Sequence, residues 1–377
     1  MTACDSAAAQ TTIWHAMPSD AARPEQRNLA PVIGDEDIHR IGAIGVWDAW
    51  PVLTRNGALA PSGLWMALAA PWFADPDARH GAARIHLLQR TATGWLELGP
   101  AMPDGFSPGS REWSGCACLE ADGHTLTLYF TAAGHRGEGR LSFDQRLFEA
   151  KATATLEGDR WRLENWRDLK ETIARDPRLY MDPAAVNGAA GTIKAFRDPG
   201  YFLDPNTGRH WLLFTASLAS SRSAFNGSIG AAVAAGDEPG DWEVLPPLIS
   251  ADGLNNELER PHIVFANNLY YLFWSTQSHV FNPEGPVGPT GLYGMVARTM
   301  SDRWTPLNGS GLVIANPPQA PRQAYSWYVL PDLSVTSFVD DWGRTDDAEG
   351  KRRFGGSFAP FLHLELDGAT ARVVGKP

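Results

Sequence analysis

Short apolar runs separated by turn-forming residues recur along most of the chain, and this pattern limits the folds that it can adopt. The runs are rich in β-branched and aromatic residues, and Gly, Pro, Asn or Asp stands between them. Examples are GLWMALAAP, TLTLYFTAA, GYFLDPNTGRHWLLFTAS and HIVFANNLYYLFWST. Segments of this length and composition are typical of β-strands, whereas helices need longer stretches with a period of 3.6 residues. The sequence therefore predicts an all-β fold.

Two of these stretches indicate hairpins directly. One has a turn cluster at residues 204–209 between two apolar runs, and the other has Asn267-Asn268 in the same place. Hairpins recur at intervals of roughly 50 to 70 residues, a spacing that favours propeller blades with loops over a sandwich. The 377 residues accommodate about five such units. We expect a five-bladed β-propeller with a central, funnel-shaped site.

Helical patterns are minor. Residues 159–176, DRWRLENWRDLKETIARD, are compatible with a short helix or with a strand that leads into one. Neither GxGxxG nor GxxxxGK occurs, which disfavours nucleotide chemistry.

Charge and hydropathy exclude several classes of partner. The formal net charge is -11 and the basic residues are scattered, so the basic patch of a nucleic-acid-binding protein is absent. The sequence contains no run of about 18 apolar residues, so it predicts no membrane-spanning helix. The first residues, MTACDSAAAQ, lack the pattern of a secretory signal. The three cysteines, Cys4, Cys116 and Cys118, do not suggest a disulfide framework. No zinc-type spacing of His and Cys is present, so we expect no catalytic metal.

The stretch VWDAWPVL combines features that a buried strand rarely combines. Asp48 stands between Trp47 and Trp50, although a carboxylate in an apolar setting is costly unless it is compensated. Asp48 can be a turn cap with both tryptophans in the core. Alternatively, the stretch forms part of a sugar site, where aromatic faces stack on the ring and carboxylates contact hydroxyls and the anomeric carbon. The 15 tryptophans of the chain favour the second interpretation.

Two further stretches place acids beside arginine and proline at the start of a hairpin. They are AFRDPGYF, with Arg197 and Asp198, and NNELERPHIVF, with Glu257 and Glu259. Each alone is compatible with an ordinary turn or a surface ion pair. Together with Asp48, they place an acid at the start of three strand-rich units, and a propeller axis would collect such positions. Paired carboxylates of this kind support glycosyl transfer with retention, in which one acid is the nucleophile and another is the acid/base.

The order of these motifs resembles the levansucrase family, family 68 of the glycoside hydrolases. VWDAWP is similar to the nucleophile motif of that family, FRDP to its transition-state-stabiliser motif and ELERP to its acid/base motif. REWSGCA, YSWYVLP and GGSFAPF are similar to three further segments, and the resemblance covers residues 45–364. It implies a five-bladed propeller that acts on sucrose. We accordingly expect residues 1–40 to be an N-terminal extension that packs on a single catalytic domain of residues 41–377.

The resemblance also implies roles for individual residues. Asp48 would be the nucleophile, Asp198 would hold two hydroxyls of the fructosyl ring, and Glu259 would be the general acid/base. Trp47 and Trp113 would flank the fructosyl pocket, and Ser114 would hydrogen-bond the nucleophile. The glucosyl side would contain Arg197, Glu257 and Tyr325. For Trp50 a core position remains the expectation, because it points away from Trp47 along the strand.

Two positions depart from the family pattern. Where relatives carry His or Arg at a position associated with polymer growth, this chain has Gln277, and His279 is the alternative if the alignment slips by two residues. A neutral Gln277 favours water or short acceptors over a growing chain. Calcium-binding relatives have an acid three residues before the acid/base; here that residue is Asn256, so we expect no structural calcium.

The resemblance thus implies a cofactor-independent, retaining fructosyltransferase or β-fructofuranosidase that uses sucrose and passes the fructosyl group to water or sugar acceptors. Two alternatives are a related five-bladed glycosidase that cuts arabinan or xylan and a non-catalytic, lectin-like propeller. Family members are usually extracellular, which fits a sucrose substrate, and the missing signal keeps cytoplasmic residence as the alternative.

Overall fold

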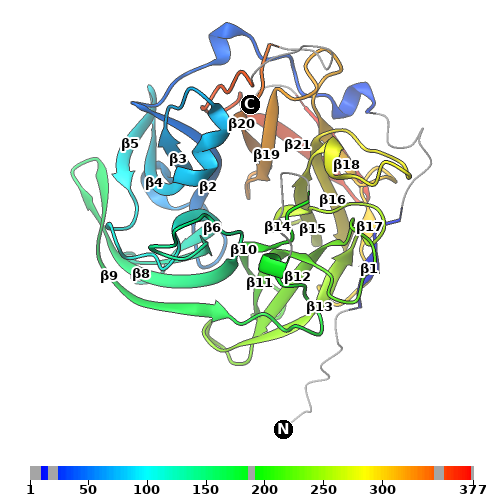
Figure 1. The fold of residues 1–377 in the computed structure, drawn as a ribbon, viewed down its shortest axis with the longest axis horizontal. Helices are drawn as coiled ribbons and strands as arrows, with labels where there is room; N and C mark the ends of the chain where they lie inside the picture. The colour runs from blue at the N-terminus through cyan, green and yellow to red at the C-terminus, as the bar shows by residue number, and fades with distance from the viewer. Residues whose placement is uncertain (1–9, 16–23, 186–191, 344–351, 375–377) are drawn as a thin grey trace.

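The computed structural model describes residues 10–15, 24–185, 192–343 and 352–374, and β-strands dominate it (Figure 1). Within these ranges every helical segment is a short 3-10 helix. These segments are η1 (Gln26–Asn28), η2 (Asp35–Asp37), η3 (Pro61–Gly63), η4 (Pro76–Ala82), η5 (Pro183–Ala185) and η6 (Ser278–Val280). None of these described segments is long and apolar enough to cross a membrane. The prediction of an all-β fold is confirmed.

The strands form antiparallel meanders that follow the chain in order. The first is β2 (Ile44–Thr54), β3 (Leu64–Pro71), β4 (Arg84–Thr91) and β5 (Gly94–Pro100). The second is β6 (Arg111–Leu119), β7 (Thr125–Ala133), β8 (Gln145–Glu157) and β9 (Arg160–Ile173). The third is β10 (Phe196–Leu203), β11 (His210–Ser217), β12 (Gly227–Ala234) and β13 (Trp242–Ser250). The fourth is β14 (Glu259–Ala266), β15 (Leu269–Thr276) and β16 (Gly291–Ala297), with β17 (Thr305–Pro306) and β18 (Leu312–Ala315) on β16. The last is β19 (Ala324–Val329), β20 (Ser334–Val339), β21 (Leu362–Asp367) and β22 (Thr370–Val373).

The first strands of the meanders contact one another in a closed ring. β2 pairs in parallel with β6 over three residues, which joins two meanders into one eight-stranded sheet. β6 contacts β10, β10 contacts β14, β14 contacts β19, and β19 returns to β2. These five strands lie nearest the centre of the view down the shortest axis (Figure 1). Side chains at equivalent heights on these strands are therefore brought toward one centre.

Each sheet is covered on both faces by its neighbours, as β11 illustrates. Its residues from His210 to Ser217 are all buried. Leu213 packs in a cluster with residues of β15, whereas Phe214 packs with Tyr129 and Leu147 of the second meander. Because alternate side chains point to opposite faces, an uninterrupted apolar run is what a strand between two layers requires. Packing of each sheet between two neighbouring layers explains the long apolar runs in the sequence.

The described part of the N-terminal segment lies along the outside of the sheets. β1 (Thr12–Ile13) pairs in parallel with the end of β13. Trp14 is buried, donates its indole N–H to the Ser310 carbonyl at 3.0 Å, and packs edge-on against Trp274. Farther along, Asn28 donates to the Val313 carbonyl at 3.0 Å. These contacts tie the segment to β13, β15 and β18.

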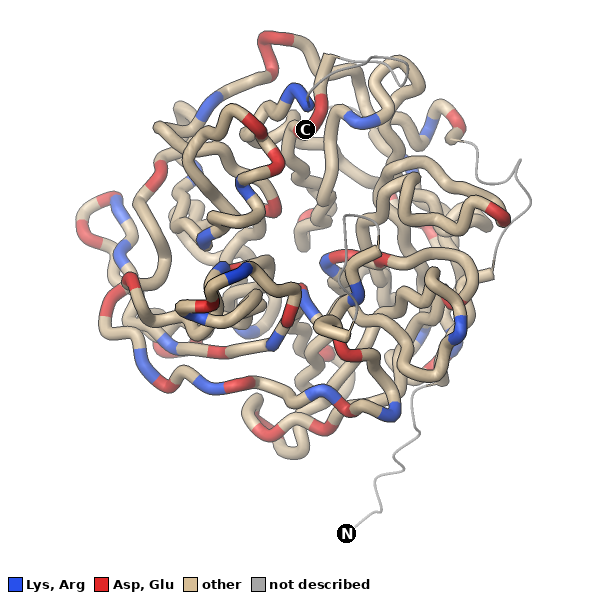
Figure 2. Tube along the Cα trace, viewed as in Figure 1, with Lys and Arg blue, Asp and Glu red and all other residues tan. Residues whose placement is uncertain are grey.

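Residues 159–176 contain no helix; a single strand, β9, runs through most of them. β9 pairs with β8 throughout, but its ladder shifts register at several points, and Asn165 and Asp168 have left-handed backbones with φ of 52° and 54°. Each bulge adds a residue to the spacing of the inward side chains, which imitates a helical period. Charges of both signs alternate along this outer strand (Figure 2).

Both predicted hairpins are present. Residues 204–209 connect β10 to β11, and Asn267-Asn268 connects β14 to β15. Both asparagines have φ near +55°, at 53° and 58°, as a two-residue type I′ turn requires.

Candidate active site

A register shift interrupts each of the five central strands near the predicted site residues. The shifts fall between Trp47 and Ala49 in β2, Trp113 and Gly115 in β6, Arg197 and Gly200 in β10, Glu259 and His262 in β14, and Tyr325 and Tyr328 in β19. A bulge leaves one residue without a ladder partner and re-aims its side chain. Five of the six motifs quoted from the sequence therefore coincide with equivalent distortions around one ring; GGSFAPF does not.

Backbone strain accompanies these bulges. Asp198, Arg260 and Ser326 have φ of 58°, 53° and 57°. Non-glycine residues in this region cost free energy, on the order of 1 kcal/mol each, and persist where surrounding contacts enforce them. At Gly115 a Cβ would lie 1.9 Å from the Tyr129 carbonyl oxygen, so only glycine permits this approach of β6 to β7.

Asp48 projects from the β2 bulge and is half-buried. Ser114 Oγ, from the β6 bulge, donates a hydrogen bond to Asp48 Oδ2 at 2.6 Å. The hydroxyl fixes one carboxylate oxygen and leaves the other free for a different partner. The predicted pairing of Ser114 with Asp48 is present in the structure.

Asp198 is held by the second and third meanders. Its backbone N–H donates to Thr131 Oγ1 at 2.9 Å, and its Oδ2 accepts from Thr215 Oγ1 at 3.1 Å. Burial raises the pKa of Asp198 to about 7; the Arg197 charge opposes this, and the charges of Glu259 and Asp48 add to it. The charges of Asp48 and Glu259 therefore lie within electrostatic range of Asp198.

Arg197 connects the acids at the start of β14. Its Nη2 donates to Glu257 Oε2 at 3.1 Å and to Glu259 Oε1 at 2.8 Å. The Tyr325 hydroxyl, from β19, donates to Glu259 Oε2. Arg197 Nη1 is buried and has no hydrogen-bond partner in the part of the chain that the structure describes. An unpaired buried donor of this kind costs about 1–3 kcal/mol, so it is a natural contact for a ligand hydroxyl.

The surroundings of Glu257 and Glu259 shift the pKa values of the two carboxyl groups in opposite directions. Burial and the neighbouring Glu259 charge raise the pKa of Glu257 to about 8, although Arg197 opposes this. Burial alone would raise the pKa of Glu259, but Arg197 and the hydrogen bond from Tyr325 outweigh it and lower that pKa. Both carboxyl groups accept from Arg197 Nη2, and each shifts the pKa of the other. With its pKa raised to about 8, the Glu257 carboxyl group favours the protonated form at neutral pH.

Arg197 lies closer to Glu259, at 2.8 Å, than to Asp198, at 3.6 Å. The elevated pKa falls on Glu257, because that carboxyl group is the more deeply buried of the two and lacks the tyrosine donor.

The predicted aromatic residues Trp47 and Trp113 lie at the β2 and β6 bulges, next to Asp48 and Ser114 in the chain. Trp47 is 3% exposed and packs edge-on against Phe354, with the Arg79 guanidinium 5.6 Å from its ring centroid. Trp113 is half-buried, with Arg111 at 5.6 Å from its ring centroid. Trp50 is fully buried, as expected for a core residue.

Gln277 and His279 lie at the end of β15. Gln277 is half-buried and precedes η6, whereas His279 is exposed within η6. His279 interacts electrostatically with Glu259, Asp340 and Arg352. His279 therefore lies within electrostatic range of Glu259.

Sequence reasoning missed Arg260, a buried residue that ties three central strands together. Its Nη1 donates to Ser326 Oγ at 2.7 Å and its Nη2 to the Ala49 carbonyl at 2.8 Å. Its backbone N–H contacts Thr215 Oγ1 at 3.2 Å. The Arg-Pro that follows Glu259 was visible in the sequence, but the contacts are made with residues 45 to 211 positions away.

Lys194 was also missed. Its ammonium donates to Asn226 Oδ1 and Asn256 Oδ1, each at 2.7 Å, and to the Ala224 carbonyl. Asn256 in turn donates to Glu257 Oε1 at 3.3 Å. A lysine charge thus stands beside the position where an acid would have suggested calcium. The described residues contain no group of three or more His, Cys, Asp or Glu arranged to hold a metal ion.

Comparisons with known proteins agree with this geometry. The sequence profile of the family described as Levansucrase/Invertase, glycoside hydrolase family 68, matches residues 5–227 and 223–376. A levansucrase of Rahnella aquatilis is 30% identical over 90% of this chain and 86% of its own length. Levansucrase LscB of Pseudomonas savastanoi pv. glycinea is 31% identical over 95% and 90%. The structure of an inulosucrase from Halalkalicoccus jeotgali bound to kestose is similar with a TM-score of 0.87 and 34% identity, covering 97% of this chain and 96% of that one. The chain belongs to the levansucrase/invertase family, family 68 of the glycoside hydrolases.

Proposed function

We propose that this protein is a retaining, sucrose-cleaving fructosyltransferase in which Asp48 is the nucleophile and Glu259 the general acid/base. The observation that carries the proposal is the cluster of Asp48, Asp198 and Glu259 on three bulged central strands, with Arg197 and Tyr325 on the acid/base. Family membership supports the substrate, because the relatives compared above are levansucrases and an inulosucrase.

The first step forms a covalent fructosyl-enzyme. The Asp48 carboxylate attacks C2 of the fructosyl ring, and the bond from C2 to the bridging oxygen breaks. That oxygen takes the proton that the Glu257–Glu259 pair holds, and glucose leaves. Ser114 fixes Asp48 for attack through its hydrogen bond of 2.6 Å.

The second step reverses the proton transfer. Water or an acceptor hydroxyl attacks C2, Glu259 takes the proton of the attacking hydroxyl, and Asp48 leaves as a carboxylate. Two inversions at C2 give overall retention. Asp198 would hold hydroxyls of the fructosyl ring, and these hydrogen bonds strengthen as positive charge develops at C2.

The remaining predicted contacts belong to the same proposal. Trp47 and Trp113 would flank the fructosyl ring, and Arg197, Glu257 and Tyr325 would meet the glucosyl unit. The unpaired Arg197 Nη1 is available as a donor to that unit. Gln277 remains the predicted acceptor contact, and the interaction of His279 with Glu259 supports the alternative. Neither is an anchor as strong as arginine, so we propose water and short sugar acceptors.

We also propose a blade number, domain bounds and a location for this protein. The closed ring of five central strands, each opening its own meander, supports a five-bladed propeller with the site in a central funnel. We propose residues 41–377 as the single catalytic domain and residues 1–40 as an extension that packs on it, in line with the contacts of Trp14 with Ser310 and of Asn28 with Val313. Because its substrate is expected outside the cell, we propose an extracellular location, which fractionation of the producing cells would test.

The experiment is incubation with concentrated sucrose while glucose, fructose and longer saccharides are followed together. Glucose in excess of fructose, with oligosaccharides accumulating, is the expected result. Asp48→Asn and Glu259→Gln should each lower glucose release by several orders of magnitude, while Glu365→Gln on an exposed strand serves as the matched control. No glucose release from the wild type would overturn the proposal.

A further inference from the structure

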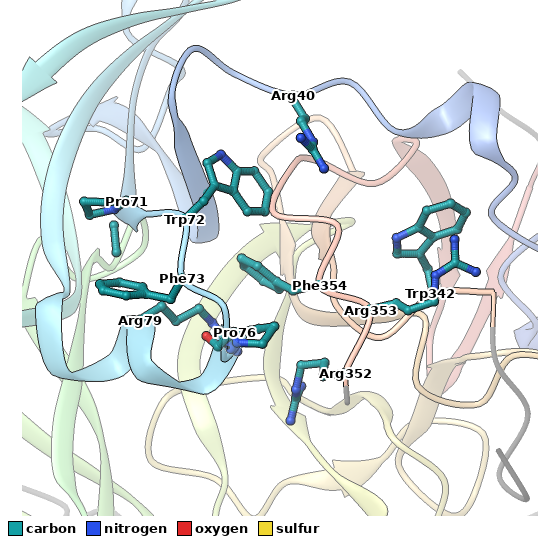
Figure 3. Close-up of a pocket in the computed structure, with 12 residues that line it drawn as sticks. Arg40, Pro71, Trp72, Phe73, Pro76, Arg79, Trp342, Arg352, Arg353 and Phe354 are labelled. Atoms are coloured by element: carbon teal, nitrogen blue, oxygen red, sulfur yellow. Dashed lines mark hydrogen bonds between the residues drawn. The ribbon is translucent and has the colours of Figure 1, made fainter. Parts of the chain in front are cut away.

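A cavity of about 310 Å³ lies beside the cluster of acids, between the start of β2, the end of β3, η4 and the segment around residue 353 (Figure 3). Its described lining consists of aromatic residues, arginines, prolines and small residues. They are Arg40, Gly45, Ala70, Pro71, Trp72, Phe73, Pro76, Arg79, Trp342, Arg352, Arg353 and Phe354. None of the residues assigned to fructosyl transfer is among them.

Two tryptophans on different sides of the cavity each carry an arginine on the ring face (Figure 3). The Arg40 guanidinium lies 4.7 Å from the Trp72 ring centroid, and that of Arg353 lies 4.2 Å from the Trp342 ring centroid. A guanidinium stacked on an aromatic ring keeps its N–H groups in its own plane, available to other acceptors. Neither the Arg40 nor the Arg353 guanidinium forms an ion pair with a carboxylate among the residues that the structure describes; the carboxylate contact of Arg353, with Asp341 Oδ1 at 2.8 Å, is made by its backbone N–H. Both cations are therefore positioned but not neutralised.

The two other arginines of the lining are held by acids outside it. Arg352 Nη1 contacts Asp340 Oδ1 at 2.6 Å, and Arg79 Nη1 contacts Asp77 Oδ1 at 3.0 Å. Arg79 is 4% exposed, and its Nε is buried without a hydrogen-bond partner in the described ranges. A buried donor that the protein leaves unpaired favours an acceptor supplied by a ligand.

The polar side chains of this lining are all donors. Arginine and the tryptophan N–H donate hydrogen bonds and accept none. A neutral sugar presents hydroxyl groups that both donate and accept, so its sites normally contain carboxylates or amides as well. A lining without side-chain acceptors matches a group that only accepts, namely a phosphate or a carboxylate. Phe73, which is 39% exposed, offers an apolar face to a ring.

We propose that this cavity binds a small ring compound bearing an anionic group, either a sugar phosphate or a sugar carboxylate. Its volume lies at the small end of ligand cavities, which fits a monosaccharide rather than a chain. The lining contains none of the acids, but it reaches the neighbour of Asp48: the Arg79 guanidinium is 4.3 Å from the Phe354 ring centroid and 5.6 Å from that of Trp47. The inference does not depend on the proposed fructosyl transfer.

Titration calorimetry tests it with four probes: glucose 6-phosphate, glucuronate, glucose and inorganic phosphate. Saturable binding of at least one anionic sugar, about tenfold or more tighter than glucose and inorganic phosphate, is the expected result. Tighter binding of glucose 6-phosphate than of glucuronate would indicate a phosphate site, and the opposite order would indicate a carboxylate site. Binding should weaken as salt is raised.

Variants locate the site. Arg353→Ala and Trp342→Ala should each weaken the anionic sugar about tenfold, whereas Arg372→Ala, an exposed arginine paired with Glu365, should not. Turnover of sucrose by Arg353→Ala should stay within about twofold of the wild type, so failure of this proposal is distinguishable from failure of the proposed function. In the Asp48→Asn variant, which should not turn over sucrose, a saturating concentration of sucrose should leave the affinity for the anionic sugar unchanged. Equal binding of glucose, loss of binding in Arg372→Ala alone, or competition by sucrose would each overturn the inference.

Discussion

Ser114 Oγ donates to Asp48 Oδ2 at 2.6 Å, across the bulges of two neighbouring central strands. The two residues are 66 positions apart, and the parallel ladder between β2 and β6 sets their spacing. A hydroxyl on one oxygen orients the carboxylate for attack with the other.

Replacing this hydroxyl should slow the first chemical step. Ser114→Ala is expected to lower kcat/KM for sucrose by roughly tenfold to a hundredfold, because a hydrogen bond to a charged group contributes about 1.5–3 kcal/mol. Steady-state kinetics measure it, with Ser221→Ala in an exposed loop as the control. Unchanged kinetics in Ser114→Ala would show that the contact does not orient the nucleophile.

The proton shared by Glu257 and Glu259 predicts the basic limb of the pH profile. The raised pKa of Glu257, about 8, means that the pair loses its last proton as the pH rises through that value, so glucose release should fall above it. In Glu257→Gln the like charge is gone, while Arg197 and Tyr325 still lower the pKa of Glu259. The basic limb should therefore move to lower pH. A limb that stays in place would contradict a shared proton.

Tyr325 should shift the same limb in the opposite direction. Its hydroxyl stabilises the ionised form of Glu259, so Tyr325→Phe removes a cause of the lowered pKa and the pKa of Glu259 rises. We expect the basic limb at higher pH and kcat reduced by about tenfold. A fall in kcat with no movement of the limb would mean that Tyr325 acts only on the substrate.

Arg260 is predicted to stabilise the ring of five central strands rather than to take part in the reaction. Arg260→Met leaves the Ala49 carbonyl and Ser326 without their buried donor and should lower the free energy of unfolding by about 2–5 kcal/mol. Urea unfolding measures this, with the exposed Arg372→Met as the matched control. Equal midpoints for Arg260→Met and the wild type would contradict the supporting role.

The sequence predicted the all-β fold and the short motifs on which the proposed site rests, but few of the contacts between them. Asp48, Asp198 and Glu259 stand in short local motifs, so their convergence could be inferred once the strands were ordered around an axis. The partners of Arg260 and Lys194 could not, because they depend on which distant strands become neighbours. β9 was ambiguous because the bulges at Asn165 and Asp168 disguise the two-residue period of a strand. The proton on Glu257 depends on burial and on the Tyr325 donor, neither of which a sequence reports.

Trapping the fructosyl-enzyme tests the central claim most directly. Glu259→Ala should still react with p-nitrophenyl β-fructofuranoside, whose leaving group needs no protonation, but should lack the base for the second step. After acid quenching and digestion, mass spectrometry should find one fructosyl group on the peptide that contains Asp48. Release of p-nitrophenol with no adduct, or with the adduct on another carboxylate, would contradict the assignment of Asp48 as the nucleophile.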